Sequence, residues 1–301
     1  MPALLAASLL TLASLQTPVD SLRPALDARI RASGATVGLY YRNLTSPDSL
    51  DLGADRSFHA ASTMKIAVMI QVFRDIDARR LRLNERIPVR NSFRSIVDSS
   101  EYALDAGDDS DSSLYERVGE TETVEELVRR MITVSSNLAT NILIERVGAS
   151  RVAATMHALG ADSVRVLRGV EDGPAYRAGR NNMATARGLG RLLAAIANAE
   201  AASANSSSRM LEILQGQRFR DAIPAGLPHR TRVAHKTGWL TGVHHDAALV
   251  YVRGDPRYVL VVMTQGLNAQ EQSASLIADL ARIIHAHVVP PEPEREPPRR
   301  P

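Results

Sequence analysis

The chain has 301 residues, of which 45% are hydrophobic and 23% charged, so it can bury the core of one large domain or of two interleaved ones. The net charge of +3 is spread over many arginines and aromatic residues make up only 4%, which argues against a nucleic-acid-binding surface. The chain contains no cysteine, which excludes disulfides, thiolate nucleophiles and cysteine-based metal sites.

The first 17 residues predict a signal peptide. An apolar run that ends near Leu15 is too short to span a bilayer, but it suits the hydrophobic part of a secretory signal. No Lys or Arg precedes the run and no clean small-x-small cleavage site follows it, so a buried N-terminal helix is the alternative. We expect a periplasmic or secreted protein with no integral membrane segment in the mature chain.

The next segments predict a helix, a pair of strands and a second, longer helix. Apolar residues at helical spacing predict a helix over 21–33, and two apolar runs predict a strand over 35–44 with a hairpin partner over 48–52. The longer helix is expected over 62–80. The acidic stretch 98–113 lacks the spacing of an EF-hand, so we expect a solvated loop there and no calcium site.

The middle of the chain is predominantly helical in its pattern. Helices are expected over 123–133, 137–147, 151–159, 185–199 and 210–215, with an irregular stretch over 164–180 and a Ser/Ala/Asn-rich linker over 201–208. Thr123, with Glu126 three residues later, forms a capping-box pattern at the start of the first of these helices.

The last third predicts strands over 231–236, 246–253 and 258–264 and a closing helix over 272–286. The predicted fold class is therefore α/β (α+β), a mixed and mostly antiparallel sheet built from both chain ends, with flanking helices and an all-helical subdomain. We divide the chain into one folded domain over 18–287 and a Pro-rich tail over 288–301 that we expect to be disordered. Within the domain, 18–60 and 209–287 form the α/β part and 61–208 the helical part.

Only two lysines occur in the chain, beside 34 arginines. Arginine cannot lose its proton near neutral pH, and its planar fork replaces a compact ammonium poorly. A chain that uses arginine almost everywhere and keeps Lys65 and Lys236 therefore indicates that an amine is needed at these two positions. Chance retention is the alternative, but both lysines lie in short motifs that occur together in one type of enzyme.

The first motif pairs Ser62 with Lys65 at the start of the predicted 62–80 helix, where a spacing of three puts both side chains on one face. The helix N-terminus offers unpaired N–H groups and a partial positive charge, which stabilise an oxyanion and lower the pKa of a nearby ammonium. A neutral lysine can then take the proton of the serine. Alone, this spacing would favour an N-cap serine and a surface lysine.

The second and third motifs supply further polar groups. The hydroxyl of Ser135 could pass a proton to a leaving group and Asn137 could hold a substrate amide, although both also fit a polar helix N-cap. In the third motif Lys236 supplies positive charge, the Thr237 hydroxyl can bind a carboxylate, and Gly238 permits close backbone approach. The alternative for this motif is a turn at the end of a strand.

Together and in this order, the three motifs resemble those of the serine penicillin-recognising enzymes, which include class A β-lactamases and penicillin-binding proteins. The middle motif is Ser135-Ser136-Asn137 here, where that family has Ser-Asp-Asn. The resemblance covers roughly residues 37–285, and the helical middle looks like that of a class A enzyme. It implies an acyl-serine intermediate and no metal or cofactor.

The resemblance also implies a role for each motif residue. Ser62 would be the acylated nucleophile, Lys65 its base and Ser135 the proton relay. Asn137 would contact the side-chain amide of the substrate.

The third motif would bind the other end of the substrate. Lys236 and Thr237 would contact its carboxylate, with Gly238 between them and the nucleophile. The backbone N–H groups of Ser62 and Trp239 would form the oxyanion hole. Trp239 either overhangs the site and restricts substrates or packs on its rim. A further cation often assists carboxylate binding in the family, and the candidates here are Arg232, His244 and His245.

The resemblance places the base for deacylation in the stretch 168–175, where Glu171 is the candidate. The family has an Asn four residues later that helps to position the water, but Ala175 occupies that place, and Asn181 and Asn182 are candidate substitutes. Glu171 and Asp172 also fit a solvated turn. The motifs therefore support acylation more strongly than turnover.

We predict an exported, monomeric serine hydrolase of the class A β-lactamase type that acts on small-molecule β-lactams and binds no nucleic acid. One alternative is a DD-peptidase or esterase of the same fold that acts on D-Ala-D-Ala-like peptides or small esters. Another is a β-lactam-binding module that is acylated without efficient deacylation. A non-catalytic scaffold domain would require the two-lysine pattern to be accidental.

Overall fold

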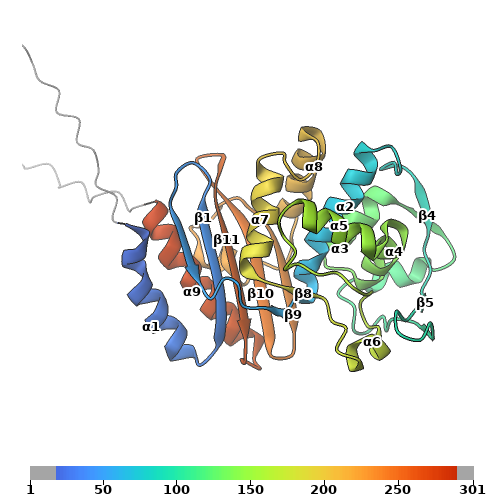
Figure 1. Cartoon of the computed structure of the whole chain (residues 1–301), viewed down its shortest axis with the longest axis horizontal. Helices are drawn as coiled ribbons and strands as arrows, with labels where there is room; N and C mark the ends of the chain where they lie inside the picture. Colours follow the sequence, from blue (N-terminus) through green and yellow to red (C-terminus); the bar gives the residue numbers. More distant parts are fainter. Residues whose placement is uncertain (1–17, 290–301) are drawn as a thin grey trace, which may run out of the picture.

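The computed structural model describes residues 18–289, so the predicted signal peptide and most of the predicted tail lie outside the described residues. One half of the molecule is a five-stranded sheet in the order β2-β1-β11-β10-β9, in which all neighbours run antiparallel (Figure 1). The strands from the beginning and end of the chain meet at its centre, where β1 (Thr36–Asn43) pairs with β11 (Asp255–Gln265). The others are β2 (Ser49–Leu52), β9 (Val233–Leu240) and β10 (Val243–Val252). The predicted fold class is confirmed.

Helices cover both faces of the sheet. On β1, Leu39 and Tyr41 belong to one core and Tyr40 to the other, as expected from the two-residue period of a strand. Helices α1 (Arg23–Ser33) and α9 (Gln270–Val288) cover the first face, and α7 (Ala186–Ala197) packs against the second (Figure 1). Since both faces are buried, the strands contain buried apolar runs, of which the longest covers residues 258–263 of β11.

The other half of the molecule is helical, and α2 (Lys65–Asp77) lies at its centre. This helix contacts all of the surrounding helices, and its residues from Lys65 to Phe73 are buried. A helix that is apolar all round is expected in such a position. The surrounding helices are α3 (Val124–Thr133), α4 (Asn137–Val147), α5 (Ala149–Ala158) and α8 (Ala204–Gln215). The first residue of α2 is thereby placed at the junction of the two halves.

Several short elements complete the fold. Three two-stranded ladders pair β3 (Phe58–His59) with β8 (Met183–Ala184), β4 (Arg86–Pro88) with β7 (Thr121–Thr123), and β5 (Phe93–Arg94) with β6 (Glu101–Tyr102). The one-turn helices are η1 (Val19–Leu22), η2 (Ala61–Met64), η3 (Ser112–Arg117), η4 (Ile223–Gly226) and α6 (Gly173–Arg177).

The predicted elements and those in the structure differ most clearly in four places. The helix expected over 62–80 begins as the 3-10 turn η2 and ends at Asp77. The strand expected over 231–236 continues to Leu240, so the Lys-Thr-Gly motif lies inside β9 and not at its end. Helix α8 begins inside the predicted linker because Ser203 caps it, accepting from the N–H of Ser206. Helix α6 forms within the stretch expected to be irregular.

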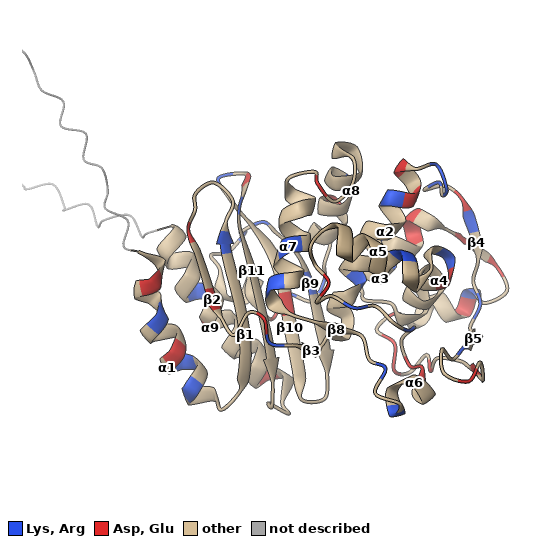
Figure 2. Cartoon of the chain, in the orientation of Figure 1, with Lys and Arg blue, Asp and Glu red and all other residues tan. Residues whose placement is uncertain are grey.

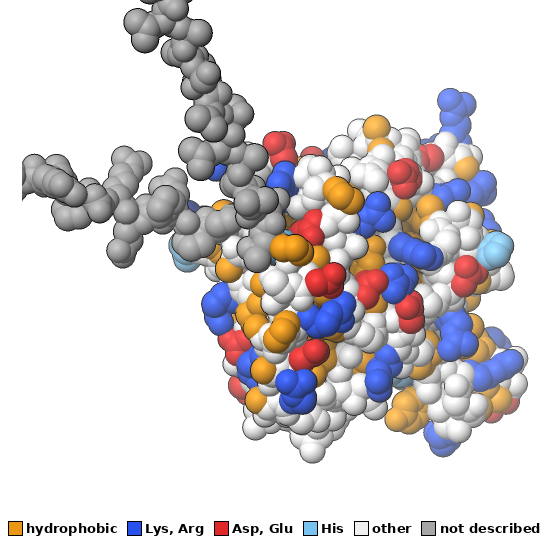
Figure 3. Space-filling view, turned by 60° about the vertical axis from the view of Figure 1, so that its left-hand side comes forward, with side chains coloured by type: hydrophobic (Ala, Val, Ile, Leu, Met, Phe, Trp, Pro, Cys, Tyr) orange, Lys and Arg blue, Asp and Glu red, His pale blue; other side chains and the backbone are white. Residues whose placement is uncertain are grey.

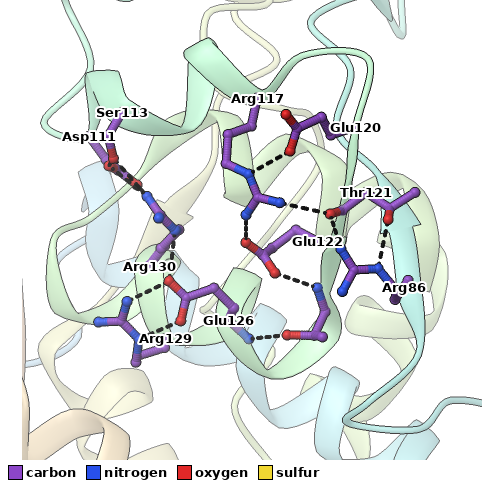
Figure 4. Close-up of polar contacts among 11 residues, drawn as sticks. Arg86, Asp111, Ser113, Arg117, Glu120, Thr121, Glu122, Glu126, Arg129 and Arg130 are labelled. Carbon is purple, nitrogen blue, oxygen red and sulfur yellow. Dashed lines mark hydrogen bonds and ion pairs between the residues drawn. The ribbon is translucent and has the colours of Figure 1, made fainter.

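The acidic stretch 98–113 is not a fully solvated loop, which corrects the prediction. Asp109 and Asp111 are both buried, because long-range partners satisfy their carboxylates. Asp111 pairs with Arg130 of α3, which also pairs with Glu126 (Figure 4). The predicted cap is present, since Thr123 Oγ1 accepts from the N–H of Glu126, but the Glu126 carboxylate bonds arginines and does not complete a capping box.

Charges of both signs are mixed over the two halves of the molecule (Figures 2 and 3). Within residues 18–289, no helix is both long and apolar enough to cross a membrane.

Candidate active site

The predicted nucleophile lies in a tight backbone turn. Ser62 belongs to η2, immediately before α2, and the preceding residue, Ala61, has a φ of 45°. This left-handed conformation costs a residue with a side chain on the order of 1–3 kcal/mol, and such strain concentrates at functional sites. The Ala61 N–H donates to Nδ1 of His59 at 3.1 Å, which helps to hold the turn. The backbone therefore fixes the direction of Ser62 before any substrate is bound.

The two lysines converge on one hydroxyl. Lys65 Nζ donates to the Ser135 carbonyl oxygen at 2.6 Å, to Asn137 Oδ1 at 2.9 Å and to Ser135 Oγ at 3.2 Å. Lys236 Nζ donates to the same Ser135 Oγ at 3.0 Å and to the carbonyl oxygen of Thr237 at 2.8 Å. The amines come from different halves of the molecule, so the fold brings the three predicted motifs together.

Both lysines are completely buried, which makes their charged forms costly. Burial lowers the pKa of Lys65 to about 7, while the charges of Asp109 and Glu171 act in the opposite direction. Burial, together with the neighbouring charge of Lys65, also lowers the pKa of Lys236 well below that of an ordinary lysine. A neutral amine is therefore accessible near neutral pH, as a proton acceptor for a serine requires.

The geometry leaves the Ser135 proton free to move. A hydroxyl has one proton and two acceptor positions, and the two lysines fill both acceptor positions. When both lysines donate, the Ser135 O–H can donate to another group, and a lysine that is neutral can instead accept the Ser135 proton. Like Ala61, Ser135 has left-handed backbone geometry, with a φ of 62°.

A buried carboxylate that sequence reasoning missed positions the second motif. Asp109 Oδ2 accepts the N–H of Asn137 at 2.8 Å and that of Leu138 at 2.9 Å, which are the first two residues of α4. A carboxylate at this place satisfies orphan N–H groups and complements the helix dipole. Its partners are about thirty residues away, so no local pattern in the sequence indicated this role. The only signal was the density of aspartates in the stretch.

Gly238 is the closest point between β9 and the nucleophile turn. A Cβ atom on Gly238 would lie 2.9 Å from the backbone nitrogen of Ser62 and 3.0 Å from that of Thr63, and backbone atoms cannot yield. Glycine is therefore required for this approach. The following residue, Trp239, has 49% of its surface exposed and lines the cleft.

Glu171 reaches the second motif from a loop before α6. Its carboxylate accepts from the Asp105 N–H at 3.3 Å and from Asn137 Nδ2 at 3.4 Å, and its φ is 62°. The residue as a whole is exposed, but partial burial of its carboxyl group raises the pKa, which the two hydrogen bonds partly counteract. A chain of contacts thus joins Lys65, Asn137 and Glu171.

The loop that carries Glu171 is held at its base by buried polar groups. Asp172 is fully buried, caps α6 through the Ala175 N–H at 3.0 Å, and accepts the Ile96 N–H at 3.0 Å. Asn141 of α4, which sequence reasoning also missed, exchanges two hydrogen bonds with the backbone of Val170, at 2.6 and 3.0 Å.

The residues considered as substitutes for the missing asparagine have other partners. Asn182 bonds the backbone of Leu167 and Arg168, and Asn181 accepts from the Arg168 side chain. Ala175 is fully buried and offers no polar side chain. None of the three places an amide beside Glu171.

A cleft of about 590 Å³ opens in front of the nucleophile. Its walls include Ser62, Ser135, Asn137, Thr237, Gly238 and Trp239, together with Asp108, Ser110, Phe219, Asp221, His244 and Gln270. The two lysines lie buried behind these groups. A volume of this size suits a small-molecule ligand.

Of the three candidate cations for carboxylate binding, only His244 lines this cleft. Arg232 stacks on Tyr251 and donates to the carbonyl oxygen of Gly254. His245 is buried with its Nε2 2.9 Å from the carbonyl oxygen of His59, and burial lowers its pKa to about 4. His244 is also buried, which lowers its pKa, so the cleft lacks a permanent cation at this position.

A serine at a strained turn, a buried lysine with a lowered pKa and a second hydroxyl shared by two amines define this protein as a serine hydrolase of the class A β-lactamase type. The family model of the β-lactamase enzyme family matches residues 21–288, and the chain belongs to this family.

Named relatives agree with this assignment. A β-lactamase of Streptomyces albus G is 30% identical over 267 residues, which cover 84% of this chain and 80% of the relative. A β-lactamase structure from Sphaerobacter thermophilus has a TM-score of 0.75 at 28% identity. The match covers 91% of this chain and 100% of the Sphaerobacter chain. An acyl-enzyme complex of a PBP-A mutant with penicillin G has a TM-score of 0.75 at 27% identity, with 90% and 97% covered.

Proposed function

We propose that this protein opens the amide bond of a β-lactam through an acyl-serine intermediate on Ser62 and then hydrolyses that intermediate. The observation that carries the proposal is the pair of buried lysines that share the Ser135 hydroxyl beside the nucleophile turn. The similarity to β-lactamases supports the substrate class.

In the acylation step, neutral Lys65 takes the proton of Ser62 while the serine oxygen attacks the carbonyl carbon. The carbon–nitrogen bond breaks, and the leaving nitrogen receives a proton from Ser135, which is replenished from the lysine side. The N–H groups of Ser62 and Trp239 stabilise the developing oxyanion, a contribution that typically lowers a barrier by about 3–4 kcal/mol per donor. The close approach of β9 to Ser62 at Gly238 supports this pairing.

The substrate lies along β9 in the proposed complex. Asn137 contacts its side-chain amide, and Thr237 contacts its carboxylate. The negative charge of that carboxylate favours protonation of Lys236, which lies behind the cleft wall and donates to the carbonyl oxygen of Thr237. Trp239 covers part of the bound ring system, because its indole ring offers a large apolar face and only one polar N–H group.

Glu171 is the proposed base for deacylation. Its raised pKa and its contact with Asn137 fit a carboxylate that accepts a proton from water and passes it on toward Lys65. The water would attack the ester carbon of the acyl-enzyme, and release of Ser62 would complete the turnover.

A second candidate function follows from the same loop. The two hydrogen bonds of Glu171 are long, and none of Ala175, Asn181 and Asn182 places a further amide beside it. A displacement of about 1 Å can cost on the order of 100-fold in rate. A protein that acylates and deacylates slowly, as a β-lactam-binding module, DD-peptidase or esterase of this fold, is therefore the alternative. The acyl-enzyme of the PBP-A mutant with penicillin G is in line with stable acylation on a related fold.

We also propose that the protein is exported to the periplasm or the medium and acts as a monomer. The apolar pattern of residues 1–17 and the family assignment support export.

The test is stopped-flow hydrolysis of a chromogenic cephalosporin, combined with intact-protein mass spectrometry of the same mixture. We expect steady turnover that is lost in Ser62→Ala and kept in Ser110→Ala, a matched change of another serine that lines the cleft. A stoichiometric burst with a lasting adduct would favour the alternative. The absence of both turnover and an adduct would exclude β-lactams as substrates.

A further inference from the structure

The walls of the cleft carry negative charge only. Asp108 and Asp221 both line it and are exposed, whereas no Arg or Lys among residues 18–289 lines it. The two lysines of the site lie behind the wall and resist protonation because they are buried. The lining therefore favours a ligand that brings positive charge of its own.

Asp221 is held in place without an internal counter-ion. Its carboxylate has one long hydrogen bond, from Gln270 Nε2 at 3.4 Å, and it forms no ion pair within residues 18–289. Two residues later, the Ile223 N–H donates to the fully buried Asp246 carboxylate at 3.1 Å. The segment that carries Asp221 is thus fixed to the sheet, and Asp221 forms part of the cleft wall.

His244 adds a second acceptor beside this carboxylate. Only 2% of the residue is exposed, yet it lines the cleft, and the charge of Asp221 raises its pKa against the larger effect of burial. The Ser273 Oγ lies 2.8 Å from the Gln270 carbonyl oxygen and 2.9 Å from His244 Nδ1. Because the hydroxyl has one proton and the carbonyl can only accept it, this arrangement favours Nδ1–H as the donor to Ser273.

The tautomer of His244 determines what it offers to a ligand. In a neutral ring with Nδ1–H, the lone pair is on Nε2. Nε2 has no hydrogen-bond partner in the described part of the chain, and it is not among the fully buried atoms that lack a partner, so a ligand can reach it. A carboxylate and an imidazole lone pair at one end of the cleft suit a cationic group and repel an anionic one.

The sheet register places this end next to the proposed carboxylate site. His244 pairs with Trp239 across β9 and β10, and Thr237 is two residues along the same face of β9. In a cephalosporin, the ring carbon that carries the carboxylate is bonded to the carbon that carries the C3 substituent. A substituent there would point toward Asp221 and His244 when the carboxylate contacts Thr237.

We propose that Asp221 and His244 form a subsite for a cationic C3 substituent, so that the protein favours zwitterionic cephalosporins over those with a neutral C3 group. This inference rests on the proposed function, because it assumes that Ser62 is acylated by β-lactams. It concerns a selectivity among substrates of the same site.

Cephaloridine and cephalothin test the subsite, because both carry a thienylacetyl side chain and differ in C3′ pyridinium against C3′ acetoxy. The measured quantity is the ratio of kcat/KM for the two compounds, in the wild type, in Asp221→Asn and in Asp255→Asn. Asp255 is exposed on β11 and does not line the cleft, so it controls for the change in net charge. Intrinsic differences between the leaving groups cancel when the ratio is compared between proteins.

We expect the ratio to fall about two- to five-fold in Asp221→Asn, the range that exposed ion pairs reach, and to stay unchanged in Asp255→Asn. The wild-type preference should also shrink as salt is added. An unchanged ratio in Asp221→Asn, or an equal fall in both variants, would overturn the subsite while leaving the proposed function intact. The absence of Ser62-dependent acylation by either compound would overturn both.

Discussion

Two regions that meet at Asn137 differ in how firmly they are held. On one side, Lys65, Ser135 and Lys236 are buried and joined by hydrogen bonds of 2.6–3.2 Å. On the other side, Glu171 lies on an exposed loop with contacts of 3.3 and 3.4 Å. The first region is pre-organised by the junction of the two halves of the fold, whereas the second is anchored only at its base.

The two steps of the proposed reaction, acylation and deacylation, therefore have different structural support. The groups proposed for acylation are fixed before substrate binds, and their burial shifts both lysines toward the neutral form. The group proposed for deacylation depends on a short helix and a capping carboxylate. Variants in the buried region should therefore act on acylation, and variants in the loop on deacylation.

The largest effect is expected from Lys65→Arg. Arginine keeps the charge but cannot release its proton, so the acylation rate should fall by about 100- to 10,000-fold, the range of general-base contributions. Single-turnover stopped flow measures this rate. In the wild type it should rise with pH and level off above the lowered pKa of Lys65, about 7, because only the neutral amine can accept a proton. In Lys65→Arg this dependence should be absent.

Lys236→Arg is the control for Lys65→Arg, because it makes the same substitution at the lysine proposed to stabilise the substrate carboxylate. It should mainly weaken substrate binding. Equal losses of acylation rate in the two variants, with equal pH dependence, would remove the distinction between base and carboxylate-binding lysine.

Glu171→Gln should separate the two halves of the reaction. It keeps the shape of the side chain and removes the base, so deacylation should slow by about 100-fold or more while acylation changes little. Mass spectrometry would then show a lasting adduct on Ser62. Glu116→Gln, at another exposed glutamate, serves as the control and should leave both steps unchanged. Unaltered turnover in Glu171→Gln would show that the loop does not supply the base.

The smallest effect is expected from Asp172→Ala. Loss of the cap of α6 should cost about 0.5–2 kcal/mol of unfolding free energy, as helix N-cap losses typically do, and should slow deacylation without changing acylation. Urea unfolding and single-turnover kinetics measure the two effects. Ser203→Ala removes the cap of α8 instead, so it should lower stability without changing deacylation. A similar slowing in both variants would point to general loosening of the fold.

Much of the site could be predicted because its residues lie in short motifs. Ser62, Lys65, Ser135, Asn137 and the Lys-Thr-Gly motif come together as expected, because helix starts and strand positions are local properties of the sequence. Apolar runs likewise predicted the central strands. The roles of these residues in catalysis remain predictions.

What the sequence did not indicate depends on contacts between distant residues. Asp109 and Asp172 look like solvated turn residues in the sequence, but each is buried against N–H groups from another segment. The positions of Asn181 and Asn182 also depend on such contacts, because Arg168 forms hydrogen bonds with both side chains and neither lies beside Glu171. The strain at Ala61 cannot be read from an alanine, which gives no sign of a left-handed backbone.

The two buried lysines also have a consequence for the tolerance of the fold to acid. Lysines of an unfolded chain titrate near pH 10.4, whereas burial lowers the pKa of Lys65 to about 7 and lowers that of Lys236 as well. Between these pH values the unfolded chain binds more protons than the folded one, so the free energy of unfolding contributed by these groups rises with pH. The two buried amines proposed to serve catalysis and substrate binding therefore contribute a higher free energy of unfolding in mild alkali than in acid.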